Sequence, residues 1–321
     1  MTPGIPEYLT GSTPILPLFL NPLGFVAGLV IEICLYTGGA LLIREFVVRT
    51  GNGWASTLIL GVAYGIVEEG LAVHTFFMAS GYPVGTLGSY GRFAGTGWVW
   101  AVGLMLFHST FSITLPLVLL KLASPENSRK PLLGNRGFIV VGLIFTADVF
   151  VLANFYRSRP FPSVWILFPA FVFVLILIAW KIPGNFLIPG GERASRNRYY
   201  YASGLSVFSF YFVYAFVIAE NHGFGVIPAV LDITVLLVFA LAMLRSIARH
   251  LPRNQNERQV FALSVGLVAP LLLFAEFLEL TGRDPGVTMV VIIALFMVYT
   301  LKKQVNLNTK DLENLNQFNK A

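Results

Sequence analysis

The sequence predicts an all-α, polytopic transmembrane helical bundle of about nine spans, with the N-terminus outside and the C-terminus in the cytoplasm. Of the 321 residues, 56% are hydrophobic and only 12% are charged, and the mean hydropathy is +0.73. Soluble domains carry about 25% charged residues, so lipid must be the solvent for most of this chain. In such a chain the net charge of +6 indicates basic loops kept in the cytoplasm rather than nucleic-acid binding.

Nine apolar stretches predict the spans, because crossing a bilayer as a helix takes about 20 mostly apolar residues. They cover residues 22–43, 55–79, 97–120, 137–156, 162–180, 200–219, 225–244, 260–281 and 286–301. The connections are short and rich in Pro, Gly, Asn and Arg, which are loop signals. We therefore expect one transmembrane domain over residues 1–303 and a polar cytoplasmic tail over residues 304–321.

The positions of the basic residues agree with this span count. With nine spans, nearly all of the 22 Lys and Arg residues fall in alternate loops and in the C-terminal tail. The other side keeps Arg92, Arg157, Arg159 and Arg283. Because basic loops stay in the cytoplasm, the alternation predicts the orientation given above and a multi-pass protein of the cell membrane. We find no internal repeat, which counts against an inverted-repeat transporter.

Ionisable residues inside the predicted spans are candidates for function, because burying a charge in lipid is expensive. The candidates, in chain order, are Glu32, Glu68, Glu69, His108, Asp148 and Glu276. Counting residues from the span ends puts Glu32, Glu68, His108 and Asp148 near the bilayer midplane. The spans hold no Lys or Arg at this depth. The carboxylates are therefore expected to be protonated, to pair with each other or with His108, or to hold a cation.

Helix phase groups some of these residues. Glu68 and Glu69 point about 100° apart in an α-helix, and a stripe of small residues (Gly61, Gly65 and Ala72) lies between them. His108 and Ser112 share one face of the next span. Small residues let helices approach closely, so the carboxylates are expected to face protein rather than lipid. Which of the two glutamates faces the site is left open. On the first span, the small residues Gly28 and Gly39 lie with Tyr36 on the Glu32 side.

The pair Glu68-Glu69, followed by a His-x-x-x-Ser pattern from His108 to Ser112, resembles the CAAX-protease and bacteriocin-processing family (CPBP or ABI) of intramembrane proteases. The resemblance implies that Glu68 or Glu69 is a general base and that His108 helps to hold the water or the oxyanion. The chain has Val73 where the family has Arg, and it has no counterpart of the family's second histidine motif. The same segment also resembles uncharacterised prokaryotic multi-pass membrane proteins.

Three functional hypotheses follow. The first is a CPBP-like intramembrane hydrolase built on Glu68, Glu69 and His108, with Glu32, Ser112, Asp148 and Glu276 as supporting residues. Its substrate would be a membrane-embedded peptide or a small molecule, and Glu69 and His108 suit a Zn²⁺ ion. The second is a proton- or cation-coupled transporter that uses the same carboxylates as a relay. The third is a non-catalytic membrane scaffold.

Overall fold

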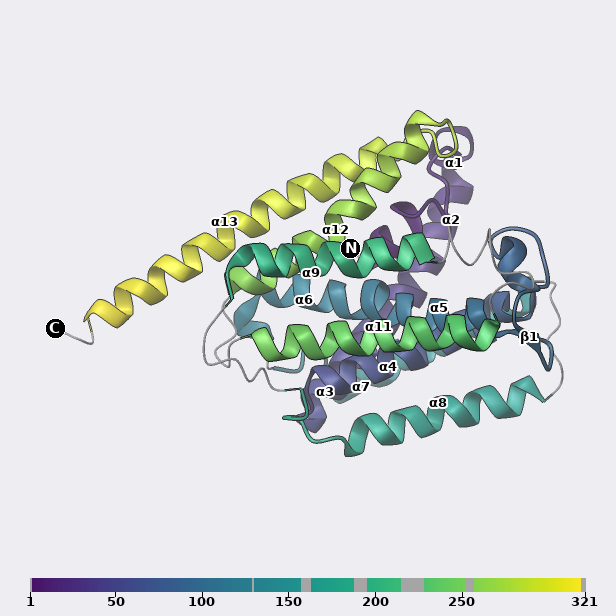
Figure 1. Ribbon diagram of the computed structural model, residues 1–321, viewed down its shortest axis with the longest axis horizontal. Helices are drawn as coiled ribbons and strands as arrows, with labels where there is room; N and C mark the ends of the chain where they lie inside the picture. Colours follow the sequence, from purple (N-terminus) through teal and green to yellow (C-terminus); the bar gives the residue numbers. More distant parts are fainter. Residues whose placement is uncertain are drawn as a thin grey trace.

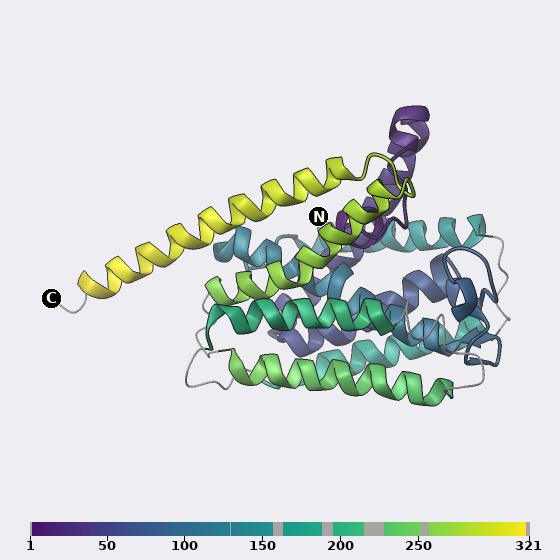
Figure 2. The ribbon, with the colours of Figure 1, turned by 45° about the horizontal axis from the view of Figure 1, so that its top comes forward.

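The computed structural model describes residues 2–128, 130–156, 163–187, 195–214, 228–251 and 257–318, with side chains up to residue 309. The predicted all-α class is confirmed, because the described residues are mostly helical and their strands are two short segments in one hairpin. Long helices run side by side along one axis, and the C-terminal helix extends beyond them (Figure 1; Figure 2 shows the same bundle turned).

The first half of the chain alternates α-helical and π-helical segments. It contains the π-helix η1 (Gly4–Tyr8), α1 (Pro17–Leu20), α2 (Pro22–Glu32), the π-helix η2 (Ile33–Thr37), α3 (Gly38–Thr50), α4 (Trp54–Ile66) and the π-helix η3 (Val67–Ala72). A loop follows, with the 3₁₀ turns η4 (Thr75–Phe77) and η5 (Gly85–Gly88) and the antiparallel strands β1 (Arg92–Phe93) and β2 (Thr96–Gly97). The third span consists of α5 (Trp98–Phe107), the π-helix η6 (His108–Thr114) and α6 (Leu115–Ala123).

The second half is made of longer α-helices. After the 3₁₀ turn η7 (Pro125–Asn127) come α7 (Asn135–Phe155), α8 (Val164–Lys181), α9 (Asn197–Phe212), α11 (Ala229–His250), α12 (Glu257–Leu280) and α13 (Thr288–Phe318). α13 continues without a break across residue 303, where the polar tail was expected to begin. The cytoplasmic location of that tail stays a prediction.

Eight helical stretches among the described residues are long and apolar enough to cross a membrane. They correspond to eight of the nine predicted spans. The remaining prediction, residues 200–219, falls on α9, whose 16 residues end at Phe212, and its last part lies outside the described residues. The orientation of the chain stays a prediction, as do Arg157 and Arg159 as outer-loop residues, which also lie outside the described part.

Local sequence explains where the first span begins and ends. Pro22 occupies the first turn of α2, where a missing N–H costs nothing, and the Asn21 side chain accepts a hydrogen bond from the Gly24 N–H. At the other end, Gly51 adopts a left-handed conformation with φ 71°, which ends α3. The helix between these signals has 29 residues, longer than the 22–43 predicted.

The second span ends seven residues earlier than predicted, at Ala72 rather than residue 79. His74 has φ 63°, outside the helical range, and the Thr75 hydroxyl folds back to donate a hydrogen bond to the Glu69 carboxylate. The apolar run that continues past residue 72 therefore belongs to the loop between the second and third spans. The Arg92 guanidinium holds that loop together through hydrogen bonds to the carbonyls of Phe77, Met78 and Gly88.

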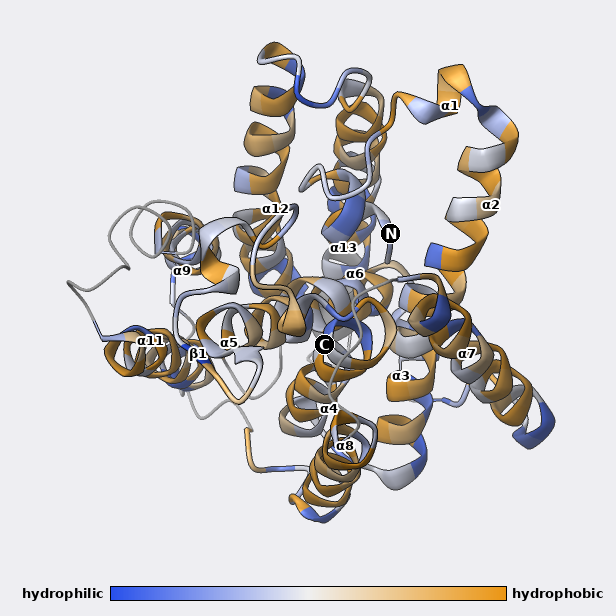
Figure 3. Cartoon of the chain, turned by 90° about the vertical axis from the view of Figure 1, so that its right-hand side faces the viewer, coloured by the Kyte–Doolittle hydropathy of each residue, from blue (hydrophilic) through white to orange (hydrophobic). Residues whose placement is uncertain are grey.

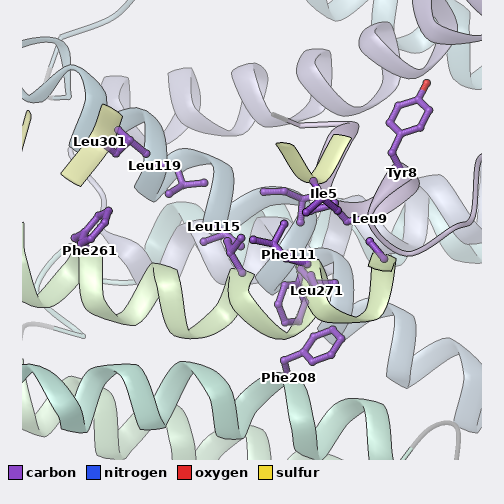
Figure 4. Close-up of a cluster of buried hydrophobic side chains, with 14 of the residues drawn as sticks. Ile5, Tyr8, Leu9, Phe111, Leu115, Leu119, Phe208, Phe261, Leu271 and Leu301 are labelled. Carbon is purple, nitrogen blue, oxygen red and sulfur yellow. The ribbon is translucent and has the colours of Figure 1, made fainter. Parts of the chain in front are cut away.

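The N-terminal 15 residues are part of the hydrophobic core rather than a free lead-in to the first span. Ile5 and Leu9 pack with Phe111 and Leu271, which come from the third span and from α12 (Figure 4). Ile15 is also buried, and its backbone N–H donates to Asp284 Oδ1 at 2.9 Å, in the turn between α12 and α13. This segment therefore connects the middle of the third span with α12 and with the turn that follows α12.

Two basic residues at the end of the first span, Arg44 and Arg49, organise the loop between α6 and α7. Arg44 is buried, and its guanidinium contacts Glu45 Oε1 at 2.6 Å and the Lys130 carbonyl at 2.8 Å. Arg49 reaches Glu45 Oε2 at 3.3 Å. Glu45 also accepts the Leu132 N–H, so one buried carboxylate ties the helix end to the loop.

Candidate functional site

The second and third spans approach each other closely where small residues face them, as predicted. A Cβ added to Gly61 would lie 2.6 Å from the Ser109 Cα, and one added to Gly65 would lie 3.1 Å from the Met105 Cα. The Ser109 hydroxyl also donates to the Leu58 carbonyl at 2.8 Å, which ties η6 to α4. Only glycine allows this spacing, so the backbones come near enough for short side chains to meet.

The polar side chains of the site come from π-helical segments. Glu7 lies in η1, Tyr36 in η2, Glu68 and Glu69 in η3, and His108 with Ser112 in η6. A π-turn widens the helix by one residue per hydrogen-bonded ring, and such turns occur frequently at functional sites. The change from α to π geometry also alters the direction of neighbouring side chains, which the α-helical phase argument did not include.

His108 lies between the two adjacent glutamates and is buried. Its Nε2 is 3.0 Å from Glu69 Oε1, and its Nδ1 is 3.0 Å from Glu68 Oε2. The Ser112 hydroxyl oxygen is 2.9 Å from Nδ1, on the same face as predicted. Both glutamates therefore face the site, each at a different edge of the imidazole. The sequence left open which of the two glutamates faces the site, and in the structure both do, because each contacts a different nitrogen of His108.

A tyrosine continues the cluster toward the N-terminus. The Tyr36 hydroxyl is within hydrogen-bonding distance of Glu68 Oε1 and of Glu7 Oε1. The Thr13 hydroxyl donates to Glu7 Oε2 at 2.7 Å. The result is one continuous network of polar contacts, in the order Glu7, Tyr36, Glu68, His108 and Glu69, in which the step from Glu68 to His108 is an ion-pair contact and the other steps are hydrogen bonds.

Sequence reasoning missed Glu7 altogether and did not include Tyr36 in the site. A signal for Glu7 was present, since it is the one charged residue among the first 31. It precedes the first predicted span, however, and the sequence gives no indication that it lies inside the bundle. Burial raises the pKa of the Glu7 carboxyl, against the hydrogen bonds from Tyr36 and Thr13, which lower it.

The far side of Glu69 is also hydrogen-bonded. Its Oε2 accepts from the Thr75 hydroxyl, and the Trp100 indole N–H donates to the same hydroxyl oxygen at 3.1 Å. Thr75 lies just past the early end of the second span, so the unexpected turn there supplies a direct contact to the site. Glu69 is thus held in one orientation from two sides.

The network opens onto a cavity of about 200 Å³ between the helices. Glu7, Glu69 and His108 line one part of it, together with Thr10 and Ser12. The rest of the wall is apolar and mostly aromatic, and includes Trp100, Phe107, Phe208, Tyr211, Phe212 and Phe274. The Tyr82 hydroxyl, from the loop after the second span, lies 3.0 Å from the Gly11 carbonyl and 3.2 Å from the Ser12 carbonyl and shares its one proton between them, which holds the N-terminal segment beside the cavity.

Three predicted supporting residues lie away from this cavity. Glu32 faces the N-terminal segment near Tyr8 and is not among the cavity-lining residues. Asp148 is on α7, near Cys34. Glu276 is at the end of α12, where its Oε2 accepts from the Thr288 hydroxyl at 3.2 Å. The structure therefore groups Glu68, Glu69, His108 and Ser112, and leaves these three apart.

The small-residue interpretation of the first span was wrong at one position. A Cβ added to Gly28 would meet nothing within 4 Å, so Gly28 is not at a helix contact. Gly39 does lie at one, because a Cβ there would be 2.4 Å from the Tyr64 ring. The close contact of the first span is thus made by its second half, α3, whereas α2 rises away from the other helices (Figure 3).

The fold and the apolar helices define a multi-pass membrane protein whose polar side chains meet inside the bundle. Residues 3–310 match the model of a family described as an uncharacterized membrane protein family, and the chain belongs to it. No curated protein and no solved structure matches this chain. The second likeness seen in the sequence, to uncharacterised multi-pass membrane proteins, is thereby confirmed, whereas the CPBP resemblance stays a hypothesis.

Proposed function

We propose that this protein is an intramembrane hydrolase in which Glu69 is the general base and His108, backed by Glu68, shares the proton. The observation that carries the proposal is the position of His108 between two carboxylates, one of which lines a cavity. A buried acid–base unit beside an apolar cavity is the usual arrangement of a site that acts on a small part of a bound molecule.

The chemistry follows from the contacts of Glu69. A water molecule in the cavity would lose a proton to the Glu69 carboxylate as its oxygen attacks a carbonyl carbon. His108, 3.0 Å from Glu69, stabilises the proton by hydrogen bonding, and Glu68 on the opposite nitrogen favours the charged imidazole. General acid–base catalysis of this kind contributes typically about 10²–10⁴-fold. The CPBP resemblance supports a peptide substrate.

The residues fit a hydrogen-bonded unit better than the zinc site expected from the sequence. The donor atoms of Glu68, Glu69 and His108 lie within 4.8 Å of one another, which is close enough to share an ion. Each carboxylate, however, contacts a different nitrogen of the His108 ring. An ion bound to one of these nitrogens would lie beside only one of the two carboxylates, whereas catalytic zinc sites use three protein ligands. No step of the proposed reaction is therefore assigned to a metal.

The transporter hypothesis draws support from the length of the network, since a chain of buried titratable groups can carry protons. Both ends of this chain, Glu7 and Glu69, line the same cavity. A relay that begins and ends at one cavity serves chemistry in that cavity better than movement across the membrane. The scaffold hypothesis offers no reason for the burial of three carboxylates around a histidine.

The test uses protein in lipid nanodiscs and a panel of internally quenched apolar peptides. We expect cleavage by the wild type, loss of most cleavage in Glu69→Gln, and normal cleavage in Glu276→Gln, a matched change outside the cavity. Zinc content is measured on the same samples and is expected to be far below one ion per chain in both the wild type and Glu69→Gln. If adding substrate to sealed vesicles causes proton uptake without cleavage, the hydrolase proposal is wrong and the transporter hypothesis is supported.

A further inference from the structure

The two contacts of the Tyr36 hydroxyl limit how many protons Glu7, Tyr36 and Glu68 carry together. It contacts a carboxylate oxygen of Glu7 and one of Glu68, but a phenol has a single O–H to donate. If both carboxyls were ionised, one of these contacts would bring two lone pairs together. Both contacts are hydrogen bonds only if one of the two carboxyls carries a proton and donates it to the phenol oxygen. The arrangement therefore stores one proton between Glu7 and Glu68.

The surroundings favour Glu7 as the residue that carries this proton. Glu68 is 3.0 Å from His108, whose positive form stabilises an ionised carboxylate, whereas Glu7 has hydroxyl partners in Tyr36 and Thr13. Burial raises the pKa of Glu7. The titratable groups that act on Glu7 or feel its charge include Tyr8, Glu32, Tyr36, Tyr82, Glu69 and His108. The cavity-lining residues that the structure describes include no lysine or arginine.

The cavity is thus bordered by two carboxyls of opposite state, a protonated Glu7 and a base at Glu69, joined internally through Tyr36, Glu68 and His108. Enzymes assign acid and base roles by placing two like groups in environments that hold them in different protonation states. Resting on the proposed hydrolase function, we infer that Glu7 is the general acid of the reaction and that the scissile bond is an amide.

The residues carry the same number of protons before and after the reaction. The water oxygen bonds to the carbonyl carbon, and its proton goes to Glu69. The C–N bond then breaks, and the amine nitrogen takes the proton of Glu7, so the products are a carboxylic acid and an amine. Return of the proton from Glu69 to Glu7, two residues that line the same cavity, restores the starting state. No oxidant, cofactor or external proton is needed.

An amide is the bond for which this acid matters most. An amine anion is too basic to leave without a proton, so amide cleavage requires a donor at the nitrogen. A nitrophenolate is a stable anion and leaves an ester unprotonated. Removing the acid should therefore slow amide hydrolysis and leave the hydrolysis of an activated ester almost unchanged.

The experiment compares an internally quenched apolar peptide with the 4-nitrophenyl ester of an apolar acyl group, on protein in nanodiscs. We expect Glu7→Gln to lower kcat for the peptide by about 10²-fold while the ester rate changes little. Glu7→Asp should recover part of the peptide rate. The wild-type peptide rate should fall as the pH rises through the pKa of Glu7, because the ionised residue cannot donate, and Glu7→Gln should lose this fall. Glu126→Gln, on an exposed loop, is the control.

The failures of the two proposals are distinguishable. If Glu69→Gln abolishes cleavage of both substrates but Glu7→Gln slows both equally or neither, the acid role of Glu7 is overturned and the hydrolase stands. If neither substrate is cleaved, infrared spectroscopy decides the proton store. The carbonyl stretch of a protonated carboxyl should be present in the wild type and in Glu126→Gln, and should be lost or shifted in Glu7→Gln. Identical spectra for Glu7→Gln, Glu68→Gln and wild type would overturn the inference.

Discussion

The helices at the centre of the molecule and those at its edge differ in both burial and geometry. In the most apolar 18-residue stretches of the second and third spans, 72% and 61% of the residues are buried, and both spans contain π-helical segments. In the corresponding stretches of α7, α8 and α11 only 11% of the residues are buried, and these helices are α-helical throughout. The edge helices are mostly hydrophobic (Figure 3), and many of their large apolar side chains are exposed. In lipid, irregular backbone is tolerated only where protein surrounds it. The comparison indicates that the edge helices shield the centre, which carries the polar site.

The largest expected effect of substitution is therefore at the centre and on activity. Glu69→Gln and His108→Ala should each lower the hydrolytic rate by at least about 10²-fold. Because the two residues share one hydrogen-bonded unit, the double variant should be little slower than either single variant. Rates for all three in nanodiscs check this. Full activity of His108→Ala would mean that the carboxylates act without the histidine. Additive losses in the double variant would mean that Glu69 and His108 belong to separate sites.

The next effect concerns the C-terminal end of the first span, where the centre meets the edge. Glu45 is fully buried and bonds to Arg44, Arg49 and the Leu132 N–H. Glu45→Ala leaves the buried Arg44 charge without its partner, which typically costs about 3–5 kcal/mol. Chemical denaturation in detergent should show this loss. A Glu126→Ala control, on the exposed part of the same loop region, should unfold like the wild type.

Sequence predicted the centre and the edge unequally well. Hydropathy predicted the edge helices, because a helix that faces lipid is apolar on all sides and can be recognised from its apolar residues alone. At the centre, the end of the second span was misplaced because the apolar residues Phe76 and Phe77 follow the turn at His74. The site partners Glu68, Glu69 and His108 were predicted, since charge in a span is conspicuous.

Two features of the site left too little trace in the sequence. A π-turn changes the hydrogen-bonding ring without requiring a particular residue, so the 100° phase argument separated Glu68 from Glu69 where the structure joins both to His108. Glu7 reaches the site through a segment that folds back over the bundle. Such a long-range contact follows from packing rather than from the local pattern.

Close helix contact at the centre gives the third prediction. Gly61→Leu places a side chain where even a Cβ would be 2.6 Å from the Ser109 Cα, so the two spans must separate. Overpacking of this kind typically costs about 1–3 kcal/mol, occasionally more. Gly28→Leu is the matched control, because a Cβ there meets nothing within 4 Å. Thermal unfolding in detergent should show a lower midpoint for Gly61→Leu alone. Equal midpoints for the two variants would mean that this face of the second span lies against lipid and not against the third span.

The smallest effect is expected at the edge, where one chemical change can be compared in two environments. Leu241 of α11 is 64% exposed, and Leu271 of α12 is fully buried in the core. Leu241 faces the hydrocarbon both before and after its contacts are lost, so Leu241→Ala should change the free energy of unfolding by no more than about 0.5 kcal/mol. Leu271→Ala removes the same atoms from a packed core and should cost about 2–5 kcal/mol. Denaturation curves for both variants in one detergent test the difference. A loss at Leu241 as large as at Leu271 would mean that α11 is covered by protein in the membrane, either by a second copy of the chain or by a partner, and the helix would then belong to an interface rather than to the lipid-facing edge.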